Sequence, residues 1–294
     1  MDTLSSPQGC KPDPIIFGGL KSISLNDTQQ QSLLRLAQEG ISVYSPHTAV
    51  DVVPDGMADW LCDIVSGAIT VPSSSTSLLG LQSQSQSQSH LSLVYPRLGE
   101  DRKVDSSASS IIRHTKTTIQ PSPGPIPEGF ENAGAGRLVT FAEREPLVAL
   151  LHRIKHATGN PASISVAIPQ SQDLNSIAIS TVGVCPGSGA GVLMKPGSSG
   201  RLPDLLLTGE LSHHNALAAI EQGSVVVALF HSNTERGYLR DVMQWKLTAG
   251  LQRLWKETSM QNGVEGEKAT DEQWGDFKVD VSQSDRDPYG IVIL

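Results

Sequence analysis

Hydrophobic residues recur along this chain with two different periods, which predict its helices and strands. Apolar residues spaced three and four apart predict helices over residues 26–40, 56–67, 145–159, 212–223 and 234–257. Short β-branched and aliphatic runs predict strands at 41–45, 136–141, 163–169, 177–185, 203–209, 224–230 and 277–282. The order strand, helix, strand around 212–223 predicts a crossover unit of a mainly parallel sheet, and therefore an α/β fold.

The composition changes in the middle of the chain. Residues 71–133 begin with runs of Ser and Gln and end in a segment rich in Pro and Gly. Such a stretch buries too little apolar area to offset its ordering entropy, so we expect a disordered insertion. It separates an N-terminal α/β part, residues 12–70, from the remaining α/β part, residues 134–294.

Charge and cysteine usage narrow the functional class. The net charge of −8 over 294 residues argues against direct nucleic-acid binding, which needs clustered Lys and Arg. Three widely spaced cysteines predict neither a disulfide framework nor a Cys-based zinc site. No apolar run approaches membrane-spanning length, and the first residues lack the pattern of a signal peptide. We expect a cytoplasmic protein without membrane contact; the sequence does not exclude the nucleus or the mitochondrion.

The stretch "HSNTE" combines imidazole, hydroxyl and carboxylate groups just after a predicted buried strand. It places His231 at the strand exit and Glu235 in the first turn of a helix, with Ser232, Asn233 and Thr234 as candidate caps. Ligands of α/β proteins gather beyond the carboxyl ends of strands, so this corner suits a metal ion or an anion. In the alternative interpretation Glu235 only complements the helix dipole, and His231 is a histidine at the edge of the core whose hydrogen bonds are satisfied.

Two further stretches carry similar chemistry. "YSPHTAVD" places His47 four residues before Asp51 after another predicted strand; the alternative is that its polar groups only satisfy turn amides. "LTGELSHHN" places His213 and His214 in the first turn of a helix capped by Ser212; the alternative is that the stretch only caps the helix and that both imidazoles are exposed. Histidine and carboxylate together are ligands for zinc, iron or manganese.

"CPGSGAG", residues 185–191, follows a predicted strand. It lacks the Lys-Ser/Thr pair of a P-loop, so we expect its glycines to form tight turns. Cys185 is expected to act as a small buried hydrophobe rather than as a nucleophile.

The ordered motifs together resemble a known family. "SVYSPHTAVD", "GAGRLVTF", "VCPGSGAGVL", "LTGELSHHNALAAIEQG" and "HSNTERGYL" resemble the Ngg-one-interacting-factor-three-like family, also described as GTP cyclohydrolase 1 type 2 homologues, in its eukaryotic branch. The resemblance covers roughly residues 12–67 and 134–289 and leaves the Ser/Gln-rich insertion unmatched.

The resemblance implies a fold, an assembly and a site. The implied fold has two similar α/β lobes facing a central cleft, and six chains form a toroidal homohexamer with a dinuclear metal site. On this resemblance His231 and Glu235 are ligands, with Glu235 bridging, and Asp51 is a further ligand. The histidines at 47, 213 and 214 are cleft residues that contact the ligands or the substrate.

The chain departs from the family pattern near its N-terminus. Family members usually carry a His-His-Pro or Tyr-His-Pro motif just before Ile-Phe, whereas "CKPDPIIF" has Asp13 in the place of a histidine. A carboxylate shifts preference toward harder ions such as magnesium or manganese. A strand-helix edge present in the family is also expected to be absent ahead of Met1.

Two functions follow as hypotheses. The first is a metal-dependent hydrolase of a small, nucleotide-like substrate that holds one or two divalent ions, zinc, iron or manganese, at Asp51, His231, Glu235 and Asp13. The alternative is a non-catalytic regulatory or scaffold protein that interacts with a transcription factor and retains a structural or vestigial metal site.

Overall fold

The computed structural model describes most of the chain. It covers residues 22–68, 92–94, 111–158, 161, 163–197, 200–261, 278–284 and 287–293. The N-terminal residues that contain Asp13, and most of 69–110, lie outside these ranges.

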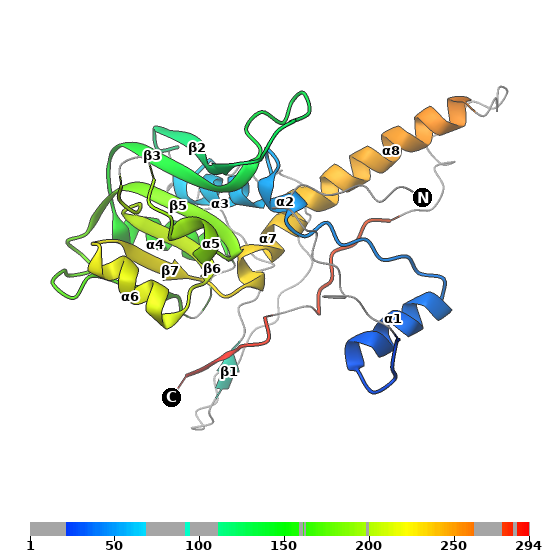
Figure 1. Ribbon diagram of the computed structural model, residues 1–294, viewed down its shortest axis with the longest axis horizontal. Coiled ribbons are helices and arrows are strands. Elements are labelled where there is room, and N and C mark those ends of the chain that lie inside the picture. The colour runs from blue at the N-terminus through cyan, green and yellow to red at the C-terminus, as the bar shows by residue number, and fades with distance from the viewer. Residues whose placement is uncertain are drawn as a thin grey trace, which may run out of the picture.

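Six strands form one mixed sheet in the order β2-β3-β5-β6-β7-β4 (Figure 1). They are β2 His114–Pro121, β3 Gly134–Pro146, β4 Ser165–Ala167, β5 Ala178–Ser188, β6 Leu205–Glu210 and β7 Val225–Ala228. β5, β6 and β7 are parallel, whereas the β2–β3, β3–β5 and β4–β7 pairs are antiparallel. The α/β class is confirmed, and the expected crossover forms at β6 and β7. The sheet is mixed rather than mainly parallel, because its edges are antiparallel.

The helices flank this sheet, and two of them extend from it. They are α1 Thr28–Gln38, α2 Ala49–Val52, α3 Met57–Ser66, α4 Leu147–Ala157, α5 Ala190–Leu193, α6 His213–Glu221, α7 Arg236–Tyr238 and α8 Gln244–Gln261. A 3-10 turn, η1 Ser232–Thr234, precedes α7, and a π-helical turn, η2 Leu239–Met243, precedes α8. Strands β1 Ser92–Val94 and β8 Ile291–Ile293 form a separate antiparallel pair.

Alternating side chains of the central strands build a core on each face of the sheet. Leu205 and Leu207 of β6 pack in the same cluster as residues of α3 and α4. Leu206, between them in sequence, packs with Leu193 of α5 and Ala219 of α6. The period-two alternation of a strand therefore produces three layers, helices on both faces of one sheet. The described part of 12–70 shares this core with 134–294.

Three local predictions of structure differ from what forms. β2 lies inside the stretch expected to be disordered, and it pairs along β3 from His114 opposite Phe141 to Pro121 opposite Gly134. The Pro- and Gly-rich residues 122–133 are therefore the loop of a hairpin. Residues 41–45 and the described residues 278–282 form no strand, because β-branched residues make a strand only where a neighbouring strand pairs with them.

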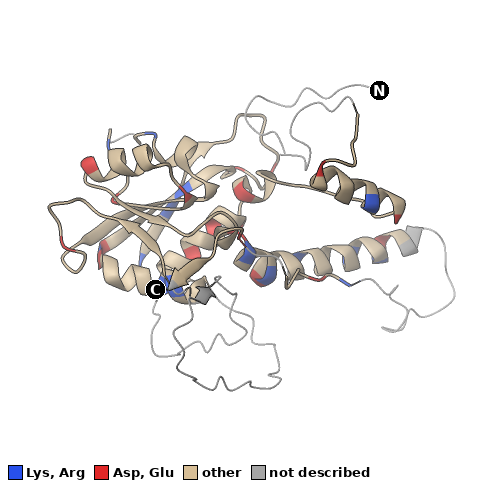
Figure 2. Ribbon diagram, turned by 90° about the horizontal axis from the view of Figure 1, so that it is seen from below, with Lys and Arg blue, Asp and Glu red and all other residues tan. Residues whose placement is uncertain are grey.

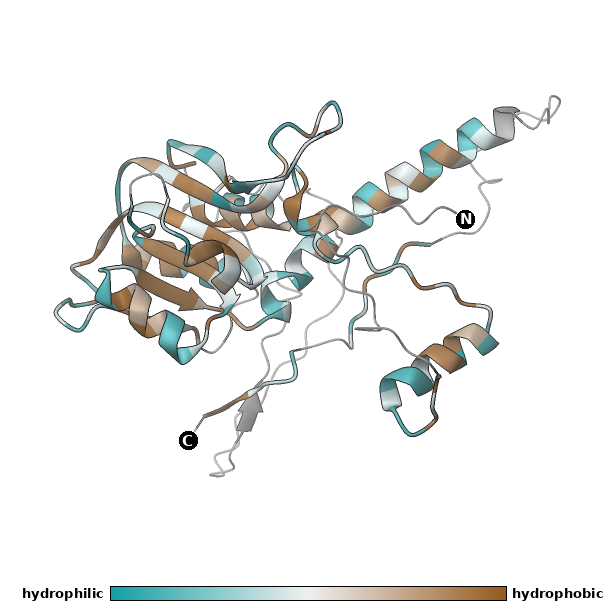
Figure 3. Cartoon of the chain, viewed as in Figure 1, coloured by the Kyte–Doolittle hydropathy of each residue, from teal (hydrophilic) through white to brown (hydrophobic). Residues whose placement is uncertain are grey.

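Helices α1 and α8 stand away from the layered body (Figure 1). α1 buries none of its residues, although Asp27 caps it by accepting a hydrogen bond from the Gln30 amide at 2.8 Å. Figure 3 shows apolar residues along both helices, outside the apolar interior of the sheet. Within the described residues, no helix combines the length and apolar character needed to cross a membrane.

Candidate functional site

The exits of three parallel strands converge at one edge of the sheet. Cys185 of β5 lies opposite Thr208 of β6, which lies opposite Ala228 of β7. Two residues beyond this row the chain reaches Gly187 and Glu210, and three residues beyond it, after the end of β7, it reaches His231. The carboxyl ends of parallel strands are where α/β proteins place ligands, so this edge is the candidate site.

The imidazole of His231 lies between two carboxylates. Its Nδ1 is 3.2 Å from Oε1 of Glu210, and its Nε2 is 3.3 Å from Oε1 of Glu235. The three side chains are between one-third and just over one-half exposed, so the group is open to solvent. The predicted pairing of His231 with Glu235 is therefore present, together with a second carboxylate on the other ring nitrogen.

Backbone and hydroxyl contacts hold the "HSNTE" turn. The Thr234 hydroxyl donates to the carbonyl oxygen of His231 at 2.7 Å, and the Ser232 amide donates to the buried carboxylate of Asp287 at 3.2 Å. His231 occupies the cap position of η1 without a side-chain cap bond. The expected capping by Ser232, Asn233 or Thr234 is thus wrong, because Thr234 ties the turn from its end instead.

Gly187 lies directly against the His231 and Glu235 side chains. Its φ is +61°, and a Cβ at this position would be 3.0 Å from His231 Nε2 and 3.3 Å from Glu235 Oε1. Its amide donates to the Thr234 hydroxyl at 2.9 Å, while its carbonyl accepts from the Thr208 hydroxyl at 3.1 Å. The expected tight turn is wrong for Gly187, because this glycine lies within β5, at a shift in the register between β5 and β6, where it leaves room for the imidazole.

Asp51, on the short helix α2, is a further acidic residue close enough for Glu235 and His231 to affect its pKa. Burial, followed by the negative charge of Glu235, raises the pKa of the Asp51 carboxyl from 3.8 to about 6, against the opposing effects of His47 and His231. Its Oδ1 is buried without a hydrogen-bond partner. A buried carboxylate oxygen without a donor favours a cation or a proton beside it.

The buried side chain of Arg137 on β3 holds the backbone that follows Asp51. Its Nη2 donates to the carbonyl oxygens of Val52 and Val53 at 3.4 and 3.2 Å. Its Nε and Nη2 also form a bidentate pair with Asp59 of α3, each at 3.1 Å. Arg137 thereby connects the sheet to α2 and α3.

Helix α7 packs closely on α3. A Cβ on Gly237 would collide with the indole ring of the buried Trp60, and Tyr238 meets that ring edge-on with centroids 6.5 Å apart. The Tyr238 hydroxyl donates to the carbonyl oxygen of Asp55 at 3.2 Å. These contacts place the "HSNTERG" segment beside the helix pair that carries Asp51.

The remaining predicted residues are distributed unevenly. His47 is exposed at φ +31° and close enough to influence Asp51. His213 and His214 are exposed in the first turn of α6, with ring centroids 5.5 Å apart, and Ser212 caps that helix as predicted. Asp13 lies outside the described residues. In the part of the chain that the structure describes, no group of three or more His, Cys, Asp or Glu side chains is arranged to hold a metal ion.

Glu210 is the residue that our sequence analysis missed. It ends β6 within the quoted stretch "LTGELSHHN". A signal was available, because β6 and β7 are consecutive parallel strands and their carboxyl ends meet at one edge. Cys185, by contrast, is buried as expected, and burial raises the pKa of its thiol to about 12.

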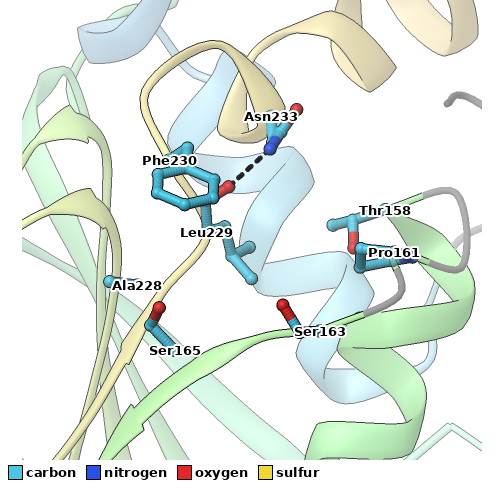
Figure 4. Close-up of a pocket in the computed structure, with 8 residues that line it drawn as sticks. All are labelled: Thr158, Pro161, Ser163, Ser165, Ala228, Leu229, Phe230 and Asn233. Atoms are coloured by element: carbon cyan, nitrogen blue, oxygen red, sulfur yellow. Dashed lines mark hydrogen bonds between the residues drawn. The ribbon is translucent and has the colours of Figure 1, made fainter. Parts of the chain in front are cut away.

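A small cavity lies behind the same corner (Figure 4). Its volume is about 10 Å³, which is room for about one water molecule. Among the residues lining it are Thr158, Ser163, Ser165 and Asn233, and the Asn233 amide donates to the Leu229 carbonyl at 2.7 Å. Its size excludes this cavity as a nucleotide site.

Comparison with known proteins identifies the family. Residues 13–260 match the family described as Duf34/NIF3 (NGG1p interacting factor 3). The chain belongs to the NIF3 family. It is 36% identical over 240 residues to the NIF3 homologue of Schizosaccharomyces pombe, covering 82% of this chain and 67% of that protein. It is 32% identical over 232 residues to NGG1-interacting factor 3 of Saccharomyces cerevisiae, covering 79% and 64%.

A solved structure agrees with the NIF3 fold. The Bacillus cereus protein related to NIF3 aligns with a TM-score of 0.51 at 16% identity, covering 82% of this chain and 76% of that one. The eukaryotic branch expected from the motifs agrees with the two yeast relatives. The chain spans about two thirds of the length of these relatives.

Proposed function

We propose that the corner formed by Asp51, His231 and Glu235 binds a divalent metal ion and that the protein is a hydrolase of a small, nucleotide-like substrate. The observation that carries the proposal is the close approach of His231 Nε2 and Glu235 Oε1, at 3.3 Å. Two donors that each lie about 2.1 Å from one zinc ion at a tetrahedral angle are roughly 3.4 Å apart. The spacing of these two side chains therefore fits shared coordination.

The chemistry of the surrounding groups supports the same proposal. Asp51 has a buried oxygen that accepts no hydrogen bond, and the negative charge of Glu235 helps to raise the pKa of the Asp51 carboxyl. Imidazole with carboxylate suits zinc, iron or manganese. We propose one or two ions per chain, with Asp13 as a further ligand. Asp13 would serve a second ion, since the spacing of His231 and Glu235 suits the coordination of one ion.

The residues of this chain would prepare the site for hydrolysis. A divalent ion supplies a Lewis acid and lowers the pKa of bound water. Gly187 keeps the space beside Nε2 of His231 free of a side chain. The contacts of Thr234 and Asp287 fix the turn, so that imidazole and carboxylate are held in place before a ligand arrives.

Metal content tests this function directly. Purified protein is loaded with Zn²⁺, dialysed and analysed for metal per chain, beside His231→Ala, Glu235→Ala and Asp51→Ala. We expect one to two ions in the unsubstituted protein and loss of at least one in each variant. His152→Ala, an exposed histidine on α4, is the control and should retain the metal. Equal metal content in the unsubstituted protein and the three site variants would contradict the site.

Activity is tested on the same preparations. The metal-loaded protein is assayed against a panel of nucleotides and phosphoesters, and we expect turnover that His231→Ala and Glu235→Ala abolish. Metal binding without turnover of any member of the panel would favour the second candidate below over the hydrolase.

A specific observation also favours a binding role. The described residues of α8 expose five large apolar side chains, Trp245, Leu247, Leu251, Leu254 and Trp255, between 43% and 55%. We propose as the second candidate a regulatory or scaffold protein that binds a transcription factor; the name of the budding yeast relative describes that protein as interacting with NGG1. The metal-site alanine variants should then leave partner binding intact.

Self-assembly belongs to the same proposal. Among the described residues, α1 and α8 expose apolar side chains that support a homo-oligomer, and the family resemblance suggests a hexamer whose chains have two lobes facing a cleft. The described strands of one chain contribute a single six-stranded sheet and one two-stranded pair.

A further inference from the structure

We infer that Glu210 is a positioning residue for His231. Its carboxylate accepts a hydrogen bond from Nδ1–H, so that Nε2 is the nitrogen that keeps its lone pair, on the side of Glu235. The inference rests on the proposed metal site, because that lone pair is what an ion would use. The observation behind the inference is the distance of 3.2 Å between His231 Nδ1 and Glu210 Oε1.

The geometry assigns different roles to the two carboxylates. The two nitrogens of an imidazole ring point in diverging directions, so Glu210 and Glu235 cannot share an ion with the same ring. Gly187 lies against Nε2 of His231 and Oε1 of Glu235. The negative charge of Glu235, not that of Glu210, helps to raise the pKa of the Asp51 carboxyl. The Nε2 side therefore faces the candidate ligands, and the Nδ1 side faces Glu210.

The chemistry explains why such a residue matters. Neutral imidazole carries one proton, and the hydrogen bond at one nitrogen decides which nitrogen keeps its lone pair. A carboxylate that accepts a hydrogen bond from this N–H group orients the ring and raises the basicity of the other nitrogen. Glu210 is well placed for this role, because it ends β6 and its backbone carbonyl accepts from the Gly189 amide at 3.4 Å.

Two substitutions at this position separate charge from hydrogen bonding. Glu210→Gln keeps an acceptor oxygen and removes the charge, whereas Glu210→Ala removes both. Zn²⁺ affinity, measured by competition with a chromogenic chelator, should fall in the order wild type, Glu210→Gln, Glu210→Ala, with a total loss of about 10- to 100-fold. Glu221→Gln, an exposed glutamate at the end of α6, is the control and should bind like wild type.

A second measurement reads the tautomer without any metal. Long-range ¹H–¹⁵N spectra of the full chain labelled at histidine, recorded at pH 9 where free imidazole is neutral, distinguish a proton on Nδ1 from one on Nε2. His231→Ala identifies the signal. We expect the Nδ1–H form in wild type and in Glu221→Gln, and a mixture of tautomers in Glu210→Ala.

The two measurements distinguish failure of the inference from failure of the metal site. If wild type binds no Zn²⁺ but Glu210→Ala changes the tautomer, the metal proposal is wrong and the positioning role stands. If Glu210→Ala has the tautomer and the Zn²⁺ affinity of wild type, the role of Glu210 is overturned. If wild type already carries the proton on Nε2, it is overturned as well.

Discussion

Gly187 determines how closely the end of β5 can approach the imidazole of His231. We predict that Gly187→Ala destabilises the protein by roughly 1–2 kcal/mol, because its φ of +61° is costly for any residue with a Cβ. The new methyl group would also displace the half-exposed His231 ring, so Zn²⁺ affinity should fall. Urea unfolding and chelator competition measure the two effects.

The control for this prediction is Gly191→Ala. Gly191 lies on the neighbouring helix α5, and nothing lies within 4 Å of its added Cβ. Alanine there should be neutral or stabilising by up to about 1 kcal/mol, since it favours the helix. Equal stability of both variants would contradict the role given to Gly187.

Asp59 is the carboxylate whose environment predicts a pH dependence of stability. Burial opposes its ionisation, but hydrogen bonds from Lys116 and Arg137 outweigh burial and hold its pKa below the ordinary value of 3.8. A pKa lowered by folding contributes stability that is fully present above the unfolded-state value. This stability is lost as the pH falls through the folded-state value.

We predict that Lys116→Gln weakens this acid dependence. Lys116 Nζ lies 2.7 Å from Asp59 Oδ1, and losing this contact raises the folded-state pKa of Asp59 toward its unfolded value. The variant should be less stable than wild type by about 1 kcal/mol at pH 7, and the difference should shrink near pH 3. Urea unfolding across this range measures it, with the exposed Lys155→Gln as control. A difference independent of pH would contradict the assignment.

At the scale of elements, α7 depends on a glycine to pack against α3. We predict that Gly237→Ala destabilises the protein by about 1–3 kcal/mol, because the added methyl group collides with the buried ring of Trp60. Gly250→Ala on α8, where nothing lies within 4 Å of the new Cβ, should be neutral or slightly stabilising. Thermal unfolding of both variants tests the contact.

A double substitution sharpens the same test. Trp60→Phe removes the ring atoms nearest to position 237, so Gly237→Ala should cost less in that background than in wild type. Additive effects of the two changes would show that the strain arises elsewhere.

Helices and strands of this protein differ in how well the local sequence predicts them. α3, α4 and α6 form where their apolar periodicity predicts, because each helix closes its hydrogen bonds within a few residues. β2 and residues 41–45 were assigned wrongly for a common reason: a strand exists only where a distant segment pairs with it. His114 lies opposite Phe141, whereas Val43 and Tyr44 pair with no strand in the described part of the chain and are 47% and 87% exposed.

At the scale of the molecule, the acidic chain presents a helix with basic residues and an apolar stripe. Basic residues gather where α8 leaves the body (Figure 2). Leu247, Leu251 and Leu254 recur three and four apart on this helix and are 43% to 55% exposed. Such a stripe normally covers another apolar surface, which supports self-association.

We predict that wild type is an oligomer by light scattering and that Leu251→Glu reduces its mass. A buried unpaired charge at the centre of the stripe is costly. Ala249→Glu places the same charge on another side of α8 and should leave the mass unchanged. A monomeric wild type, or equal effects of both substitutions, would contradict a homo-oligomer formed through this stripe.

The sequence by itself determined the α/β class, most helices, the crossover at β6 and β7, and the pairing of His231 with Glu235. These features depend on residues a few positions apart, whose spacing fixes which side chains share a face or a turn. Its motifs also indicated the NIF3 family, which the family match confirms.

Only the tertiary structure decided the order of the strands, the hairpin of β2 and β3, and the neighbours of the candidate ligands. Glu210 and His231 are 21 residues apart in sequence, and their contact exists because β6 and β7 run parallel side by side. Asp51 is still further away, and the packing of α3 against the sheet and Gly237 brings it near Glu235. Such contacts arise from global packing, which no local pattern of residues encodes.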